Sequence, residues 1–199
     1  MHKIFILLVS LNFTSITYAQ SVTKADAVAL QPQIGRDANG YNTCGIRAIV
    51  TVVNPKYAYT YDFSIQIMSK FSYGLLKAGK SSTPMKDMLK NTPNISTVMP
   101  APINFWISQE STSKPVFALK KMPAETKGYL LEVADLFNSL DAINSIVNGE
   151  RMHFAIRYKS ESIDKVISFS SKLSDEETTP LMICISEVLE RQVNALDAK

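Results

Sequence analysis

The sequence predicts an α+β domain in which a mostly antiparallel sheet carries two main helices on one face. Apolar and polar residues alternate from Tyr59 to Met68, and a second alternating run from Met152 to Tyr158 is followed by a polar turn. Such alternation is typical of strands that are buried on one side only, which favours antiparallel pairing. Apolar stripes at helical spacing occupy residues of about 136–148 and 180–196. Strands followed by a helix, a hairpin and a terminal helix are the element order of an α+β fold.

The first nineteen residues have the pattern of an export signal. Lys3 gives a positive start, residues 4–16 are largely apolar, and small residues end the segment at Ala19, before Gln20. The apolar stretch is shorter than the roughly 20 residues that a membrane span needs. We therefore predict that residues 1–19 are a signal peptide and that the protein is exported, to a periplasm or to the outside of the cell.

The rest of the chain has the length of one domain. Residues 20–42 are polar, contain Pro32, Gly35 and Gly40, and show no clean period, so we expect an extended or loosely packed N-terminal arm. Residues 43–199 are expected to form a single α+β domain.

Short β-rich segments bounded by turn residues account for the middle of the chain. We expect strands over residues 44–53, 73–78, 103–109 and 129–134. Thr83 followed by Pro84 fits the start of a short helix through Leu89, because proline is favoured at the first helical position. The rest of 81–102, and 111–115, are expected to be loops.

The two main helices have recognisable ends. Asp135 is a suitable cap for the first helix, which is expected to end at Gly149. Ser174 and Glu177 fit a capping box for the second helix, but Pro180 would then lie inside it and clash with the preceding turn. We therefore expect this helix to begin near Pro180.

The two cysteines, Cys44 and Cys184, are far apart in the sequence. In an oxidising compartment such a lone pair predicts a structural disulfide rather than two free thiols. Cys184 lies on the apolar stripe of the last helix, where the strand that contains Cys44 can meet it.

Charge and composition argue against several classes of protein. The chain has 21 basic and 18 acidic residues, and this balance argues against a nucleic-acid partner. Beyond the signal no apolar run is long enough to span a membrane. His153 is the single histidine left after signal removal, so we expect no metal site, no cofactor and no cysteine–histidine catalysis.

One stretch matches a phosphate-binding loop. Residues 74–81 satisfy the pattern G-x-x-x-x-G-K-[ST]. The chemistry of that loop needs a buried parallel strand before it and a helix after it, whereas the preceding strand alternates and Pro84 interrupts the required helix. We therefore interpret the match as a lysine-flanked strand end. Two S-x-x-K strings, at 111–114 and 162–165, lie in predicted turns and lack the other motifs of that enzyme class.

These exclusions favour an exported non-enzymatic protein that binds another protein or an envelope component, as an inhibitor, immunity or accessory factor. Long irregular loops on a rigid sheet often carry binding functions. The candidate binding surface is therefore the loop over 81–102 with the strands beside it, and its candidate residues are Tyr59, Tyr61, Lys80, Met85 and Trp106. Core packing is an equally good explanation for the two tyrosines.

Two alternatives remain open at this stage. An exported hydrolase would use carboxylates such as Glu132, Asp135 or Glu150, which lie near the ends of predicted elements. A small-molecule carrier would use the apolar face of the sheet.

Overall fold

The computed structural model describes residues 22–88, 96–110, 115–116 and 118–197. The predicted signal peptide, residues 1–19, and part of the predicted binding loop over 81–102 lie outside the described residues.

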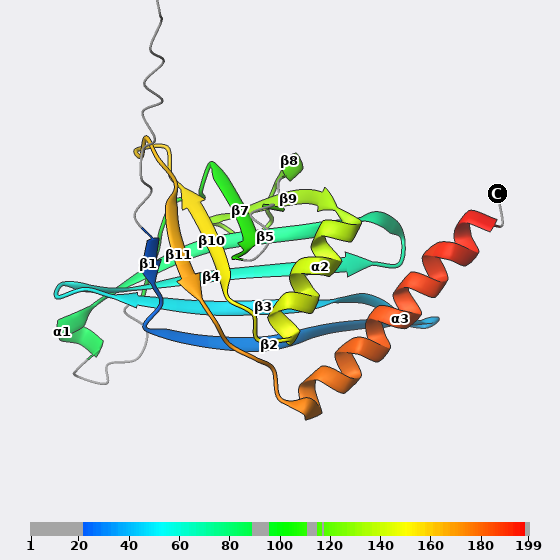
Figure 1. Ribbon diagram of the computed structural model, residues 1–199. Helices are drawn as coiled ribbons and strands as arrows, with labels where there is room; N and C mark the ends of the chain where they lie inside the picture. Colours follow the sequence, from blue (N-terminus) through cyan, green and yellow to red (C-terminus); the bar gives the residue numbers. More distant parts are fainter. Residues whose placement is uncertain (1–21, 89–95, 111–114, 117, 198–199) are drawn as a thin grey trace, which may run out of the picture.

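A large antiparallel sheet forms the back layer of the molecule (Figure 1). Its strand order is β2-β3-β4-β5-β9-β8, and β6 pairs with the end of β5. The strands are β2 (Ala27–Asp37), β3 (Gly40–Val53), β4 (Tyr57–Met68), β5 (Phe71–Pro84), β6 (Thr97–Val98), β8 (Ala118–Pro123) and β9 (Tyr129–Asp135). The four-residue helix α1 (Met85–Met88) follows β5 directly.

A smaller sheet crosses in front of the large one (Figure 1). Its order is β1-β11-β10-β7, with β1 parallel to β11 and the other pairs antiparallel. These strands are β1 (Val22–Lys24), β7 (Asn104–Gln109), β10 (Met152–Arg157) and β11 (Lys165–Phe169). The hairpin of β10 and β11 is the one that the alternating run from Met152 predicts.

The core lies between the two layers. The inward residues of β4, including Tyr61 and Phe63, are almost fully buried. The ring of Phe63 stacks on that of Phe154 from the small sheet, with 4.8 Å between centroids. Two helices, α2 (Leu136–Val147) and α3 (Asp175–Asp197), pack on the same side of the large sheet (Figure 1). The α+β class with mostly antiparallel sheets is thus confirmed.

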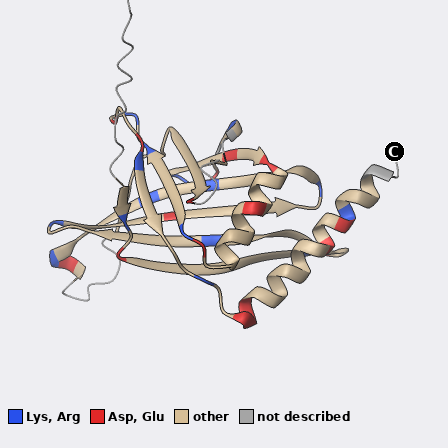
Figure 2. Ribbon diagram, viewed as in Figure 1, with Lys and Arg blue, Asp and Glu red and all other residues tan. Residues whose placement is uncertain are grey.

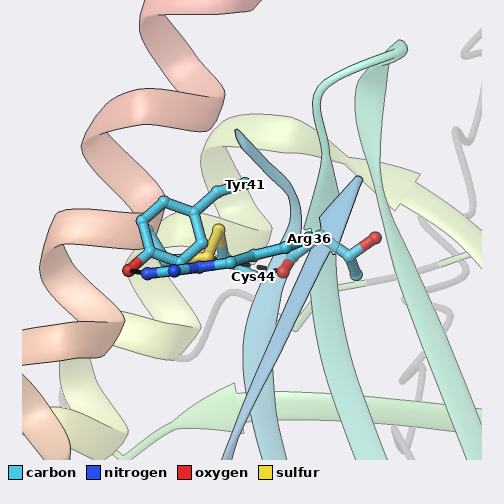
Figure 3. Close-up of a disulfide and its surroundings, with 5 residues drawn as sticks. Arg36, Tyr41 and Cys44 are labelled. Atoms are coloured by element: carbon cyan, nitrogen blue, oxygen red, sulfur yellow. Dashed lines mark hydrogen bonds between the residues drawn. A yellow bond between two sulfur atoms is a disulfide. The ribbon is translucent and has the colours of Figure 1, made fainter. Parts of the chain in front are cut away.

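The predicted disulfide joins Cys44 on β3 to Cys184 on α3, and the two Cα atoms are 5.8 Å apart. Beside it, the guanidinium of Arg36 lies 4.0 Å from the ring centroid of Tyr41 and donates a hydrogen bond to its hydroxyl (Figure 3). The bridge closes a sequence separation of 140 residues. In the chain-entropy model, a loop of that length stabilises a fold by about 4 to 5 kcal/mol.

Residues 27–37, within the expected extended or loosely packed arm, form a regular strand. The whole of β2 pairs with β3, from Ala27 opposite Thr51 to Asp37 opposite Gly40, with a bulge at Gly35. Pro32 is tolerated there because β2 is an edge strand. The sequence shows no clean alternation here because a bulge shifts which side chains point to which face of the strand.

The start of the last helix also differs from the prediction near Pro180. Helix α3 begins at Asp175, because the capping box forms: the backbone N–H of Ser174 donates to the Glu177 carboxylate at 3.0 Å. Figure 2 shows the acidic residues gathered at this end, where the helix dipole favours negative charge. Pro180 removes one backbone donor from the helix, and the cap and the dipole offset that loss.

The match to a phosphate-binding loop lies within β5, and its glycines have packing roles. A Cβ on Gly74 would lie 2.1 Å from the Ser139 hydroxyl, so this glycine lets α2 approach the sheet. A Cβ on Gly79 would lie 2.8 Å from the ring of Tyr129, which crosses β5 at that point. Close approach of neighbouring side chains, rather than phosphate binding, explains both glycines.

Candidate ligand-binding site

Three of the predicted binding residues, Tyr59, Tyr61 and Lys80, lie together on the inner face of the large sheet. Lys80 on β5 pairs directly with Tyr61 on β4, so both side chains point to the same side. Tyr158, just after β10, and Lys165, at the start of β11, approach them from the small sheet. We call these five residues the lysine–tyrosine cluster.

Aromatic faces surround the ammonium groups of the cluster. The Lys80 Nζ lies 4.1 Å from the ring centroid of Tyr59, 5.2 Å from that of Tyr61 and 5.4 Å from that of Tyr158. The Lys165 Nζ lies 5.3 Å and 5.8 Å from the centroids of Tyr59 and Tyr61. Attraction to the ring faces holds the two like charges in one place.

The electrostatic setting of Lys80 is unfavourable for its charge. Burial, and then the positive charge of Lys165, lower the pKa of Lys80 to about 8, and the carboxylate of Glu161 opposes the shift. Burial also raises the pKa of Tyr61 and Tyr158 above the ordinary value, so both phenols stay protonated as donors.

The polar groups of the cluster lack acceptors. The hydroxyls of Tyr61 and Tyr158 are buried and make no hydrogen bond to any of the residues that the structure describes. Within the described part of the chain, no ion pair joins either lysine to an acidic residue. Glu161 instead accepts a hydrogen bond from the backbone N–H of Tyr158 at 3.0 Å. Buried donors are normally paired, so a group of unpaired ones needs an explanation.

A hollow of about 380 Å³ opens beside the cluster. It is lined by Lys165, Glu161 and the side chains of the turn between β10 and β11, with Thr23 of β1 on the other side. Asp164 also lines it, but this carboxylate is engaged, by the indole N–H of Trp106 at 2.7 Å and by the Arg157 guanidinium at 3.2 Å. Lys165 is the cluster residue that lines this hollow.

The opposite, uncovered face of the same strands carries a network in which the polar groups are paired. Arg47 donates to both carboxylate oxygens of Asp62, at 2.8 and 2.7 Å, and the Tyr129 hydroxyl donates to Asp62 at 2.6 Å. Burial alone would raise the pKa of Asp62, but these hydrogen bonds outweigh it, and the pKa is lowered. Two shallow grooves, of about 230 and 320 Å³, flank this network.

Glu132 is a separate buried acid on the inner face. Its side chain is fully buried, and neither carboxylate oxygen makes a hydrogen bond within the described part of the chain. The Lys121 Nζ forms an ion pair with Oε1 at 3.7 Å. Burial raises the pKa of Glu132 to about 7, although Lys121 opposes the shift.

The remaining predicted residues lie elsewhere. Trp106 points to the outer face of the small sheet, since it pairs with Ala155 rather than with the inward residues of β10. Met85 begins α1 and donates its backbone N–H to Lys56. The other two candidate carboxylates do not join Glu132: Asp135 caps α2, and Glu150 is exposed after it.

Two members of the cluster were missing from the predicted set. The alternation from Met152 to Tyr158 places Tyr158 on the same strand face as Phe154, so a signal for its inward position exists in the sequence. Lys165 carries no such signal, because its position depends on how the small sheet crosses the large one.

Comparisons with known proteins add no family to this description. No protein-family model, curated protein or solved structure matches the chain. Among the described helices, none has the length and apolar character of a membrane span. The described residues also contain no group of three or more histidine, cysteine or acidic side chains arranged to hold a metal ion.

Proposed function

We propose that this chain is an exported, non-enzymatic protein that binds another protein or an envelope component, and that the lysine–tyrosine cluster contributes to the binding surface. A role as an inhibitor, immunity or accessory factor fits this proposal. The disulfide between Cys44 and Cys184 is consistent with an oxidising, exported environment.

The observation that carries the proposal is the set of unpaired donors in the cluster. Among the described residues, neither Lys80 nor Lys165 has an acidic partner within ion-pair distance, and both lie against the same tyrosine rings. The two buried phenols beside them make no hydrogen bond within the same residues. Like charges held together reduce stability, so such an arrangement is more typical of a site that meets a ligand than of a stabilising network.

The hydrolase alternative has less support from the geometry. A carboxylate pair for general acid and base catalysis has to face one substrate. Here Glu132 is buried, Asp135 accepts a hydrogen bond from the backbone of α2, and Glu150 is exposed at the other end of that helix. The three carboxylates therefore do not share a cavity.

Capture of a partner from the native compartment tests the proposal. The baits are the mature protein, the double variant Lys80→Met/Lys165→Met, and the control Lys77→Met. Lys77 lies on β5 three residues before Lys80, but its Nζ points to the uncovered face, 4.8 Å from the Tyr129 ring centroid. We expect the same component to be enriched by the mature protein and the control and to be lost with the double variant. Equal enrichment by all three baits would contradict the proposed role of the cluster.

A further inference from the structure

We infer that the lysine–tyrosine cluster binds a phosphate group, presented either by a soluble phosphate ester or by the headgroup of an anionic phospholipid. The inference deepens the proposed function, on which it rests, by naming the chemical group that the binding surface recognises.

The charge of the site is the first argument. Lys80 and Lys165 bring two positive charges to one set of tyrosine rings, and Glu161 is the acidic group whose charge reaches them. Asp164, the other acid that lines the hollow, is occupied by Arg157 and Trp106. The site therefore keeps a net positive charge. Because the two lysines are partly buried, their attraction to an anion is only weakly screened by solvent and salt.

The donors of the site are the second argument. The buried hydroxyls of Tyr61 and Tyr158 lack acceptors, and both ammonium groups lie over the same rings. The hollow beside Lys165 is lined by residues with side-chain hydroxyls, among them Ser160 and Ser162. The ammonium groups and the serine hydroxyls are able to donate, and an anion with several oxygens accepts from several such donors at once.

The type of donor favours phosphate over carboxylate. A planar carboxylate is best matched by the fork of an arginine, whereas lysine acts as a point charge and is a common partner of phosphate oxygens. A tetrahedral dianion also offers acceptors in several directions, which suits donors that come from both sheets. The cluster contains two lysines and no arginine.

Calorimetric titration with inorganic phosphate, at constant ionic strength and neutral pH, tests the inference on the full mature chain. We expect saturable binding that weakens by about tenfold or more in Lys80→Met and in Lys165→Met, since a hydrogen bond to a charged group is worth that much. Lys77→Met should bind like the unaltered protein. Glu161→Gln should bind a few times more tightly, because it removes the negative charge at the site.

Thermal unfolding of each variant shows whether it is folded, and the Glu161→Gln variant keeps the test decisive even if a lysine variant unfolds. Absence of saturable phosphate binding by the folded, unaltered protein would overturn the inference. Binding that is unchanged in Lys80→Met, Lys165→Met and Glu161→Gln alike would overturn it as well.

Sedimentation with vesicles distinguishes the two sources of the phosphate. Vesicles of phosphatidylglycerol are compared with vesicles of phosphatidylcholine, using the same variants. Inorganic phosphate binding together with cluster-dependent sedimentation on phosphatidylglycerol alone supports a lipid headgroup, and phosphate binding without such sedimentation supports a soluble ester. If neither phosphate nor vesicles bind while partner capture still depends on Lys80 and Lys165, the phosphate inference fails and the proposed function stands. If phosphate binds but no component is captured through the cluster, the proposed function fails.

Discussion

The two faces of the β4–β5 strand pair differ in whether their polar side chains are hydrogen-bonded to one another. On the uncovered face, Asp62 is held by Arg47 and Tyr129. One residue earlier on β4, Tyr61 points to the inner face beside Lys80, and its phenol has no hydrogen-bond partner among the described residues. We call the first a closed network, because its donors and acceptors are paired within the protein. The second is an open network, because its donors lack such partners.

This difference separates a stabilising role from a binding role. A network that satisfies its own donors and acceptors rigidifies the sheet and needs no ligand. An open group of donors reduces stability until an acceptor arrives, and a binding site has this property. The comparison therefore predicts that changes on the uncovered face affect stability alone, whereas changes at the lysine–tyrosine cluster affect binding.

The largest expected effect comes from the disulfide that links the large sheet to helix α3. Replacement of both Cys44 and Cys184 by serine opens a loop that spans a separation of 140 residues. We expect the free energy of unfolding to fall by about 4 to 5 kcal/mol in the chain-entropy model. Denaturant unfolding of the variant and of the oxidised protein measures the difference. A loss below about 1 kcal/mol would show that α3 docks without the bridge.

The next effect concerns Glu132, the buried acid of the inner face. Its pKa of about 7 in the fold exceeds the ordinary value of 4.5, so the protonated form is favoured by folding. The stability that this gives is present below pH 4.5 and is lost as the pH rises through 7. The full loss is about 3 kcal/mol by linkage.

The variant Glu132→Gln should remove this part of the pH dependence and be more stable than the unaltered protein in weakly alkaline buffer. Glu110→Gln serves as the control, because Glu110 is half exposed in its ion pair with Arg151. Unfolding curves measured at acidic and alkaline pH provide the test. Parallel pH profiles for the unaltered protein and Glu132→Gln would show that the carboxyl is ionised in the fold.

A smaller effect is expected when the closed network is broken. Asp62→Asn removes the charge that Arg47 and Tyr129 share, and because the guanidinium is partly exposed we expect a loss of about 1 kcal/mol at neutral pH. The lowered pKa of Asp62 means that this contribution is lost as the pH falls below the ordinary value of 3.8. Phosphate binding should not change.

Gly79→Ala offers an independent way to break the same network, since the new methyl group would displace the Tyr129 ring from its path across β5. Chemical denaturation and phosphate titration of both variants check these expectations. A drop in phosphate affinity in either variant would contradict the separation of the two faces.

Local patterns in the sequence predicted the parts of the fold that depend on neighbouring residues. The alternation of Tyr59–Met68, the cap at Asp135 and the hairpin after Met152 depend on such neighbours, and all three are present. The first turn of α3 did not follow from the sequence, because the rule against proline inside a helix outweighed a capping box that in fact forms.

The candidate site was predicted only in part. The register of an antiparallel pair places Lys80 beside Tyr61, and the sequence predicts both as binding residues because they lie on strands beside the 81–102 loop. Lys165 and Glu161 come from the other sheet, and the angle at which two sheets cross is set by the packing of the whole core. No spacing within the sequence reveals it.

The most direct test of the lysine–tyrosine cluster as a binding site is a measurement of the pKa of Lys80. The pKa is obtained by NMR of the Lys80 side-chain Cε, with and without phosphate. Because of its burial and the nearby charge of Lys165, the ammonium group should titrate with a pKa of about 8. Bound phosphate should raise this pKa, because the anion stabilises the charged form. A pKa close to the ordinary 10.5 that does not respond to phosphate would show that the charge of Lys80 is already satisfied within the protein, and would contradict the assignment of a binding site to this cluster.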